Sequence, residues 1–293
     1  MVGLYRIHET GGPEVLHWED DTLPEPEGDQ VRVRHTAIGL NYIDVYHRSG
    51  LYPLPLPARL GTEAAGVVEA VGENVSDLTI GDEIAAASLL KGLTACYLLT
   101  RTYRVAPEHV LLVHAAAGGV GLILCQWARA IGATVIGTVG SEEKAALARE
   151  NGADHTILYR QEDVVARVRE LTGGRGVDVV YDSIGRDTFQ ASLDFLAPLG
   201  MFVSYGNASG NAPAVSPHDL QTRGSLFFTR PTLATYSARP EDLRAMADEL
   251  FGLISAGTVR VHVNQHYPLS ELARAHRDLE ARATTGSTVL LPG

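Results

Sequence analysis

The feature that most constrains the fold is a glycine turn between an apolar run and a helical pattern. Val110–His114 is short and apolar, and it leads into Ala116-x-Gly118-x-x-Gly121. Apolar residues then recur at helical spacing, and Thr134–Val139 is a β-branched run typical of a strand. Strand, turn, helix and strand in this order predict part of a doubly wound parallel sheet. The alternative is a plain tight turn in an α/β domain that binds no nucleotide.

The glycines of this turn have physical roles in binding a dinucleotide. A residue without Cβ at Gly118 lets a pyrophosphate approach the main chain, and Gly121 lets the helix pack closely against the strands. The start of the helix offers backbone N–H groups and the positive end of its dipole to phosphates. The motif has alanine in place of its first glycine, but its position between strand and helix favours dinucleotide binding.

The end of the second strand indicates which dinucleotide binds. An NAD site usually has Asp or Glu there to hold the ribose hydroxyls. Here Val139 occupies that place, followed by Gly140 and Ser141. Lys144 follows one helical turn later, within reach of a 2′-phosphate, with Ser141 as a hydroxyl donor. The sequence therefore favours NADPH over NADH. The alternative is that Lys144 is an ordinary solvated residue of the helix.

Strand and helix patterns divide the chain into two predicted domains. The first part, to about residue 88, is β-rich, and strands and helices alternate from about residue 110. The end of the chain predicts a helix from Pro240, a strand at Val259–Val263 and a helix near 270–283. We predict an α/β protein with a Rossmann parallel sheet in 89–237 and a β-rich domain in 1–88 and 238–293.

Composition argues against several classes of protein. With 24 Lys+Arg, 35 Asp+Glu and no basic stripe, the net charge of −11 argues against a nucleic-acid partner. Apolar runs stay below the roughly 18 residues of a membrane span, and the N-terminal sequence does not resemble a secretory signal. Two cysteines, Cys96 and Cys125, cannot form a disulfide scaffold. We therefore expect a cytoplasmic protein.

Segments in order along nearly the whole chain carry a family resemblance: GGPEVL (11–16), AIGLNYIDVYHRSGLYP (37–53), LGTEAAGVVEAVG (60–72), LLKGLTA (89–95), HAAAGGVGLILCQWA (114–128), VVYDSIGRDTF (179–189), VSYGNASG (203–210) and RATTGS (282–287). They are similar to segments of the NADPH:quinone oxidoreductases, the zeta-crystallin-like, zinc-free branch of the medium-chain dehydrogenase/reductase superfamily. The resemblance implies a GroES-like catalytic domain built from both chain ends, a Rossmann domain, a homodimer, and hydride transfer from NADPH to quinones or related acceptors.

Two positions indicate that the site holds no metal. Zinc-dependent relatives have a ligating Cys before the first-domain helix and a His in a G-H-E motif, and here those places hold Asn41 and Thr62. The four-cysteine structural lobe of such relatives is also missing, and two cysteines cannot supply either zinc site. A metal-free reaction follows from these substitutions.

The resemblance also implies the residues that contact the cofactor. They are Asn41, Tyr42, Ile43, Asp44 and Tyr46 of the LNYIDVY loop, Tyr97, Gly118, Gly119 and Val120 of the pyrophosphate turn, Gly140, Ser141, Lys144 and Tyr159 at the adenine-ribose phosphate, Ser183, Tyr205, Gly206 and Asn207 near the nicotinamide, and Arg282. Asn41, Tyr46 and Tyr52 are the catalytic candidates, with Tyr46, Tyr52 or water as the proton source.

Each of these assignments has a structural alternative. Asn41 is of a residue type that often caps helices. Tyr46 and Tyr52 are of a type that often packs between the core and the surface. Tyr205 is compatible with the core of a strand, and Arg282 with an ion pair to a nearby acid, Asp278 or Glu280.

Three functions are compatible with these residues. The favoured prediction is NADPH-dependent, zinc-free hydride transfer to a quinone, a small planar acceptor. A second is a zinc-free enoyl reductase, which reduces an α,β-unsaturated carbonyl and needs an electrophile for the enolate oxygen. The third is a crystallin-like protein that keeps the NADPH pocket without selection for catalysis.

The chain departs from the family pattern after Gly81-Asp82-Glu83-Ile84. Family members continue there with further strands and a proline-containing link, whereas this chain runs directly into an alanine-rich segment at residue 85. About thirty family residues are missing by this comparison. A genuine deletion removes strands from the first domain and opens one side of the acceptor site. The alternative is an omitted segment, which adds about 3 kDa to an intact mass of 31.4 kDa.

Overall fold

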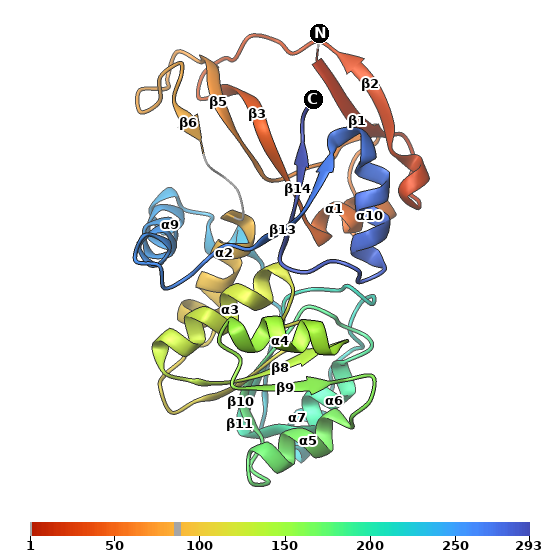
Figure 1. The fold of residues 1–293 in the computed structure, drawn as a ribbon, viewed down its shortest axis with the longest axis vertical. Helices are drawn as coiled ribbons and strands as arrows, with labels where there is room; N and C mark the ends of the chain where they lie inside the picture. The colour runs from red at the N-terminus through yellow and green to blue at the C-terminus, as the bar shows by residue number, and fades with distance from the viewer. Residues whose placement is uncertain (1, 85–88) are drawn as a thin grey trace. The chain divides into compact units, whose positions relative to one another are not determined.

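The chain forms two compact units in the computed structural model, which describes residues 2–84 and 89–293 (Figure 1). The first unit comprises Met1–Leu90 and Val263–Gly293, and the second comprises Lys91–His262. The sequence-based division returned to the first domain at residue 238, so the two divisions differ in where they assign the segment 238–262.

The second unit is built on a six-stranded parallel sheet in the order β12-β11-β10-β7-β8-β9. From β7 the chain proceeds outward to β8 and β9, and then crosses back to β10, β11 and β12. This reversal creates the topological switch point at which doubly wound sheets bind ligands. The predicted Rossmann sheet is confirmed, with strands β7 (Val110–Val113), β8 (Thr134–Val139), β9 (His155–Leu158), β10 (Val177–Asp182), β11 (Leu196–Ser204) and β12 (Phe227–Thr229).

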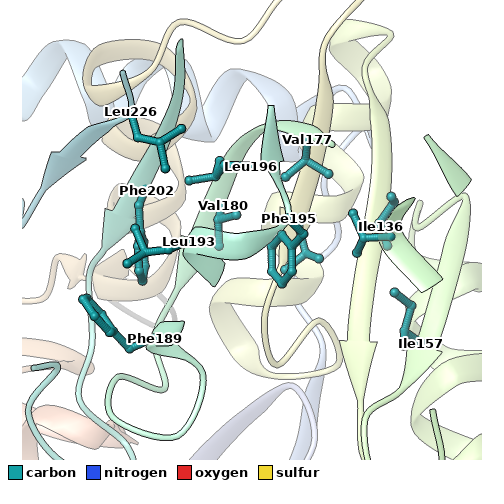
Figure 2. Packing of buried hydrophobic residues seen from close by; sticks show 12 residues of the cluster. Ile136, Ile157, Val177, Val180, Phe189, Leu193, Phe195, Leu196, Phe202 and Leu226 are labelled. Carbon is teal, nitrogen blue, oxygen red and sulfur yellow. The ribbon is translucent and has the colours of Figure 1, made fainter. Parts of the chain in front are cut away.

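Apolar side chains bury one side of this sheet against helices. Figure 2 shows Phe189, Phe202 and Val180 among the buried residues, and the Phe189 and Phe202 rings lie 5.6 Å apart. Because parallel strands are covered on both faces, their residues are almost continuously apolar. The helical segments of this part of the chain are α2 (Leu89–Tyr97), a π-helical turn (Leu98–Thr102), α3 (Gly119–Ile131), α4 (Glu142–Glu150), α5 (Val164–Leu171), α6 (Phe189–Asp194), α7 (Pro217–Thr222), α8 (Leu233–Tyr236) and α9 (Pro240–Ser255).

Helix α9 belongs to the second unit because it contacts α2 and the turn that follows it. A Cβ built on Gly92 would lie 2.4 Å from Leu250 Cδ2, so the two helices approach closely at a glycine. Arg101 Nη1 also donates to Glu249 Oε2 at 3.1 Å. After α9, the N–H of Val259 donates to Leu253 O and closes the helix end. The strand predicted at Val259–Val263 is therefore wrong in its bounds, and β13 starts at Val263.

The first unit joins both ends of the chain in one sheet, as predicted. Its five-stranded sheet has the order β13-β14-β3-β5-β6, and β14 near the C-terminus pairs antiparallel with β3. A second sheet has the order β2-β1-β4. The elements are β1 (Val2–Ile7), β2 (His17–Asp21), β3 (Val31–Leu40), α1 (Tyr42–Ser49), β4 (Ala58–Arg59), β5 (Ala64–Val71), β6 (Glu83–Ile84), β13 (Val263–Pro268), α10 (Leu272–Glu280) and β14 (Ser287–Leu291), with 3₁₀ turns at Pro13–Val15 and Leu269–Glu271.

One edge of the five-stranded sheet ends in a very short strand. β6 has two residues, which pair antiparallel with Gly66 and Val67 of β5. The predicted shortening of the chain falls at the junction after Ile84, and residues 85–88 lie outside the described residues.

Candidate cofactor and catalytic site

The glycine turn connects β7 to the start of α3. Ala115 takes a left-handed backbone conformation with φ of +52°, and its carbonyl accepts from the N–H of Gly118 at 2.8 Å. Gly118 is the N-cap of α3, and Gly119 and Val120 form its first turn. A Cβ at Gly121 would lie 2.4 Å from the Ala115 oxygen, so the helix can begin this close to the turn only with glycine there.

This turn fits the pyrophosphate of a dinucleotide. The first N–H groups of a helix have no intrahelical partner, and the positive end of the helix dipole adds to their attraction for an anion. Gly118, Gly119 and Val120 are partly exposed at this end of α3, which is 13 residues long. The absence of side-chain bulk at Gly118 leaves its main chain open to a phosphate.

The residues predicted to hold the adenine-ribose phosphate come together at the ends of β8 and β9. The hydroxyl of Ser141 caps α4 by accepting from the N–H of Lys144 at 3.4 Å. A Cβ on Gly140 would lie 2.8 Å from the Tyr159 hydroxyl, so glycine leaves room for that ring. The guanidinium of Arg160 lies 5.9 Å from the Tyr159 ring centroid, and the sequence analysis missed this cation.

An acid also lies at this end of the site. The Ser141 hydroxyl is hydrogen-bonded to Glu143, and this bond lowers the pKa of the Glu143 carboxyl below its usual value. A carboxylate in the first turn of a helix is favoured by the helix dipole. The first turn of α4 therefore carries a negative charge at Glu143 next to Ser141.

The predicted nicotinamide-side residues form two loops in backbone contact. The N–H groups of Tyr205 and Ala208 donate to the carbonyls of Asp182 and Ser183 at 2.8 and 3.1 Å. A Cβ on Gly206 would lie 2.6 Å from the Ser183 carbonyl oxygen. Ser183 and the segment of Tyr205, Gly206 and Asn207 thus form one surface at the carboxyl end of the sheet.

Tyr97 lies in a different environment from the other predicted cofactor residues. Its side chain is 2% exposed, and its ring stacks on Tyr236 with centroids 4.7 Å apart and planes 10° from parallel. Its role in cofactor binding stays a prediction.

In the first unit, α1 begins with a buried polar cluster. The Asn41 backbone N–H donates to Asp44 Oδ2 at 2.8 Å, and the Asn41 amide donates to Glu63 Oε2 at 2.9 Å. Glu63 Oε1 accepts from the N–H of Leu90 at 3.1 Å. Asn41 is the N-cap residue of α1, and Glu63 holds its side-chain amide in a defined orientation. Ile43 follows in the first turn.

Three tyrosines follow one another around α1. The rings of Tyr42 and Tyr46 lie 5.8 Å apart, and those of Tyr46 and Tyr52 lie 4.9 Å apart. The Tyr52 N–H donates to the Tyr46 carbonyl at 3.1 Å, which folds the loop after α1 back onto the helix. Burial raises the pKa of Tyr42, so its hydroxyl stays protonated at neutral pH. The structure thus brings the two tyrosine candidates into direct contact.

The side chain of Arg48 ties α1 to α10. It is 2% exposed and makes two bonds to the Glu280 carboxylate, at 3.0 and 2.7 Å. Its Nη1 also lies 3.4 Å from His276 Nδ1. Burial, with the Arg48 charge, lowers the pKa of His276 to about 3, so this histidine is neutral at pH 7.

Arg282 lies just beyond the end of α10. Its φ is +58°, and its N–H donates to Leu279 O at 3.1 Å, while the Tyr42 hydroxyl donates to the same carbonyl at 3.3 Å. The two acids named as possible partners of Arg282 also contact other residues: Glu280 pairs with Arg48, and Asp278 accepts from the Tyr267 hydroxyl. The charge of Arg282 lies near the Tyr42 hydroxyl and lowers its pKa against the larger effect of burial.

Sequence reasoning missed several residues that organise these regions. Glu63, Arg48 and Glu280 are buried or half-buried charged residues with specific partners, and nothing in their sequence spacing distinguishes them from surface charges. Glu63 had one usable signal, the glycine at position 39 within β3, because a Cβ there would lie 2.2 Å from the Glu63 carboxylate.

The structure also bears on metal and membrane chemistry. Among residues 2–84 and 89–293, no group of three or more His, Cys, Asp or Glu side chains is arranged to hold a metal ion. Within the same ranges, no helix has both the length and the apolar character needed to cross a bilayer.

Comparison with known proteins identifies the family. The family model of the zinc-binding dehydrogenases matches residues 119–251, and that of the alcohol dehydrogenase GroES-like domain matches 27–128. The chain is 52% identical to a quinone oxidoreductase of Pseudomonas aeruginosa, covering 96% of this chain and 97% of the relative. It is 45% identical to a 2-haloacrylate reductase of a Burkholderia species, covering 100% and 99%.

Comparison of structures agrees with these matches. A crystal structure of Escherichia coli quinone oxidoreductase complexed with NADPH has a TM-score of 0.96 and 46% identity, covering 99% of this chain and 100% of that one. The Burkholderia alignment runs over 332 positions against the 293 residues of this chain, so at least 39 positions (332 − 293) lack a residue here. Even with this shortening, the chain belongs to the quinone oxidoreductase family of the medium-chain dehydrogenases/reductases.

Proposed function

We propose that this chain is an NADPH-dependent quinone reductase that works without zinc. The observation that carries the proposal is the glycine turn at the switch point of the parallel sheet, followed by Ser141, Lys144 and Tyr159 where an NAD site has an acid. The NADPH-bound E. coli quinone oxidoreductase supports it through its fold and sequence identity. The family membership supports the same reaction.

The chain's own residues bind and orient the cofactor. The first turn of α3 binds the pyrophosphate, and Ser141, Lys144 and Tyr159 bind the 2′-phosphate. When bound, NADPH supplies a hydride from C4 of its nicotinamide to the acceptor. The nicotinamide ring is held in position for transfer by Ser183, Tyr205, Gly206 and Asn207. A defined geometry of this kind contributes much of the rate in such reactions.

The tyrosines of the first unit are proposed to contact the acceptor. Tyr46 and Tyr52 together offer flat aromatic faces and hydroxyl donors, which suit a planar acceptor with two carbonyl oxygens. A quinone that gains a hydride becomes a hydroquinone anion, which is stable enough to need little acid assistance. A site without a Lewis acid is adequate for this reaction.

Steady-state kinetics test the proposed function. Purified protein is assayed with NADPH and with NADH, against 1,2- and 1,4-quinones and against enones, before and after treatment with a chelator. We expect quinone turnover with NADPH that the chelator leaves unchanged. Activity that disappears with the chelator, or turnover restricted to enones, would contradict the proposal.

Lys144→Ala tests the preference for NADPH. The substitution removes a cation from the 2′-phosphate site, and charge-assisted hydrogen bonds contribute about 1.5–3 kcal/mol. We expect KM for NADPH to rise by about 10- to 100-fold, while KM for NADH, which has no 2′-phosphate, changes by less than about twofold. Equal changes for both cofactors would show that Lys144 does not recognise the phosphate.

Tyr46→Phe and Tyr52→Phe test assisted protonation of the acceptor. Each substitution keeps the ring and removes the hydroxyl. We expect the double variant to lose about tenfold in kcat with a 1,4-quinone, since positioned general acids contribute about 10²–10⁴-fold and a hydroquinone anion needs little such help. Full turnover by the double variant would assign the proton to water.

A second candidate reaction is reduction of an activated carbon–carbon double bond. It is favoured by the 45% identity to a 2-haloacrylate reductase over the whole chain. That reaction needs an electrophile for the developing enolate oxygen, and the hydroxyls of Tyr46 and Tyr52 are the proposed donors. The ratio of kcat/KM for a para-quinone and for an enone distinguishes the two reactions.

We infer further that the protein is a cytoplasmic homodimer. β12 is an edge strand of the parallel sheet, and the Phe227 side chain is 55% exposed on it, which is the kind of edge that pairs with a second copy. The net charge of −11 favours a protein without nucleic-acid partners. Light scattering of the purified protein measures the oligomeric state directly.

A further inference from the structure

A buried chain of polar side chains runs beneath the predicted cofactor loops. His114 directly follows β7, Thr138 lies near the end of β8, and Asp182 ends β10; Ser192 of α6 lies between His114 and Asp182. All four side chains are buried, and Asp182 is 0% exposed. Buried polar groups of this kind destabilise a protein unless they are hydrogen-bonded, and these four bond to one another.

Asp182 organises the loops on the nicotinamide side. Its Oδ1 accepts from the N–H groups of Ile184 and Gly185 at 2.6 and 3.0 Å, and its Oδ2 accepts from the Thr188 hydroxyl at 2.6 Å. Its backbone carbonyl accepts from Tyr205 N–H at 2.8 Å. One residue thus fixes both loops that carry the predicted nicotinamide contacts.

His114 continues the chain toward the pyrophosphate turn. Its Nε2 lies 3.0 Å from Ser192 Oγ and its Nδ1 lies 2.9 Å from Thr138 Oγ1. Complete burial lowers the pKa of His114, so the ring is neutral. Because the Ser192 hydroxyl donates to Asp182 Oδ2 at 3.4 Å, Nε2 carries the ring proton and Nδ1 accepts from Thr138. The hydrogen bonds therefore run in one direction, ending at the carboxylate.

We propose that Asp182, Ser192 and His114 are positioning residues that set the spacing between the pyrophosphate turn and the nicotinamide-side loops. The His114 backbone immediately precedes Ala115, whose carbonyl anchors Gly118, and Thr138 O accepts from Ala116 N–H at 3.2 Å. A dinucleotide must contact both loops and the turn at once, so a shift of one relative to the other weakens binding. The inference rests on the proposed NADPH-binding function.

Ser192→Ala removes the connection at its centre and leaves every predicted cofactor contact in place. Its matched control is Thr172→Val, which removes a hydroxyl that accepts from Gly176 N–H at 2.9 Å, just before the opposite end of β10. We expect Ser192→Ala to raise the NADPH Kd at least tenfold, measured by quenching of protein fluorescence. kcat at saturating NADPH should stay within twofold, and Thr172→Val should leave Kd unchanged even if its Tm falls equally.

Substitutions at Asp182 supply the conservative comparison. Asp182→Asn keeps an oxygen acceptor for Ile184 and Gly185, so it should bind NADPH more tightly than Asp182→Ala, which loses every side-chain bond. An unchanged Kd for Ser192→Ala, beside a wild type that binds NADPH, would overturn the positioning role alone. A wild type that fails to bind NADPH would overturn the proposed function and this inference with it. If Asp182→Ala does not fold, the positioning role is tested by the NADPH Kd of Ser192→Ala and of Thr188→Val. The second substitution removes the hydroxyl that donates to Asp182.

Discussion

Gly121→Ala is expected to weaken NADPH binding at least tenfold and to lower the free energy of unfolding by about 2–3 kcal/mol. The added Cβ would lie 2.4 Å from the Ala115 oxygen and 2.8 Å from the Ala116 Cα and C, all of them backbone atoms. No side-chain rotation relieves this contact, so α3 must move away from the turn. Isothermal titration with NADPH and urea denaturation measure the two effects.

Gly252→Ala is the matched control for this substitution. Gly252 is also a helical glycine, but a Cβ built there meets nothing within 4 Å. Alanine has a higher helix propensity than glycine, so we expect a gain of up to about 1 kcal/mol and unchanged NADPH binding. If Gly121→Ala behaved like Gly252→Ala, the close approach of α3 to the turn would have no role in binding.

Arg48→Ala is expected to lower the free energy of unfolding by about 3 kcal/mol. The change removes two bonds to Glu280 and leaves a cavity between α1 and α10, where the guanidinium is 2% exposed. The midpoint of urea denaturation measures this loss. We expect KM for the acceptor to rise as well, because α1 carries Tyr46.

Arg274→Ala provides the comparison within the same unit. Arg274 is 63% exposed and pairs with Glu271 at 2.9 Å on the surface of α10. Exposed ion pairs contribute little, so the expected loss is below about 1 kcal/mol. Equal losses for the two arginine variants would mean that the contact of Arg48 with Glu280 does not hold the two helices together.

The parts of the fold with strong local patterns were predictable from sequence. The turn at Gly118, the following helix and the β-branched strand at Thr134–Val139 each show a periodicity that depends only on nearby residues. The family resemblance supplied what local pattern cannot, which is that strands from the two chain ends share one sheet. Gly140, Ser141, Lys144 and Tyr159 were predicted at one end of the sheet and lie together there.

Contacts between residues distant in sequence were beyond such prediction. Arg48 and Glu280 are separated by 232 positions, and each alone has the composition of a surface residue. Asp182 lies inside a motif that was recognised, yet its proposed role depends on Ser192 in α6 and on His114 directly after β7. The residue at which the chain re-enters the first unit was also hard to predict, because the assignment of α9 to the second unit depends on the packing of Leu250 against Gly92.

The strand order of the first unit has a consequence for the order in which the protein folds during synthesis. β14 lies between β13 and β3, so the five-stranded sheet lacks an interior strand until Ser287–Leu291 are made. The second unit is one continuous segment and is complete at His262. At about 5–20 residues per second, the 29 residues from His262 to the end of β14 (291 − 262) take about 1.5–6 seconds to make, and the parallel sheet can form in that time. The sheet that contains β3 and β5 is therefore completed after the parallel sheet, although these two strands precede the parallel sheet in the chain.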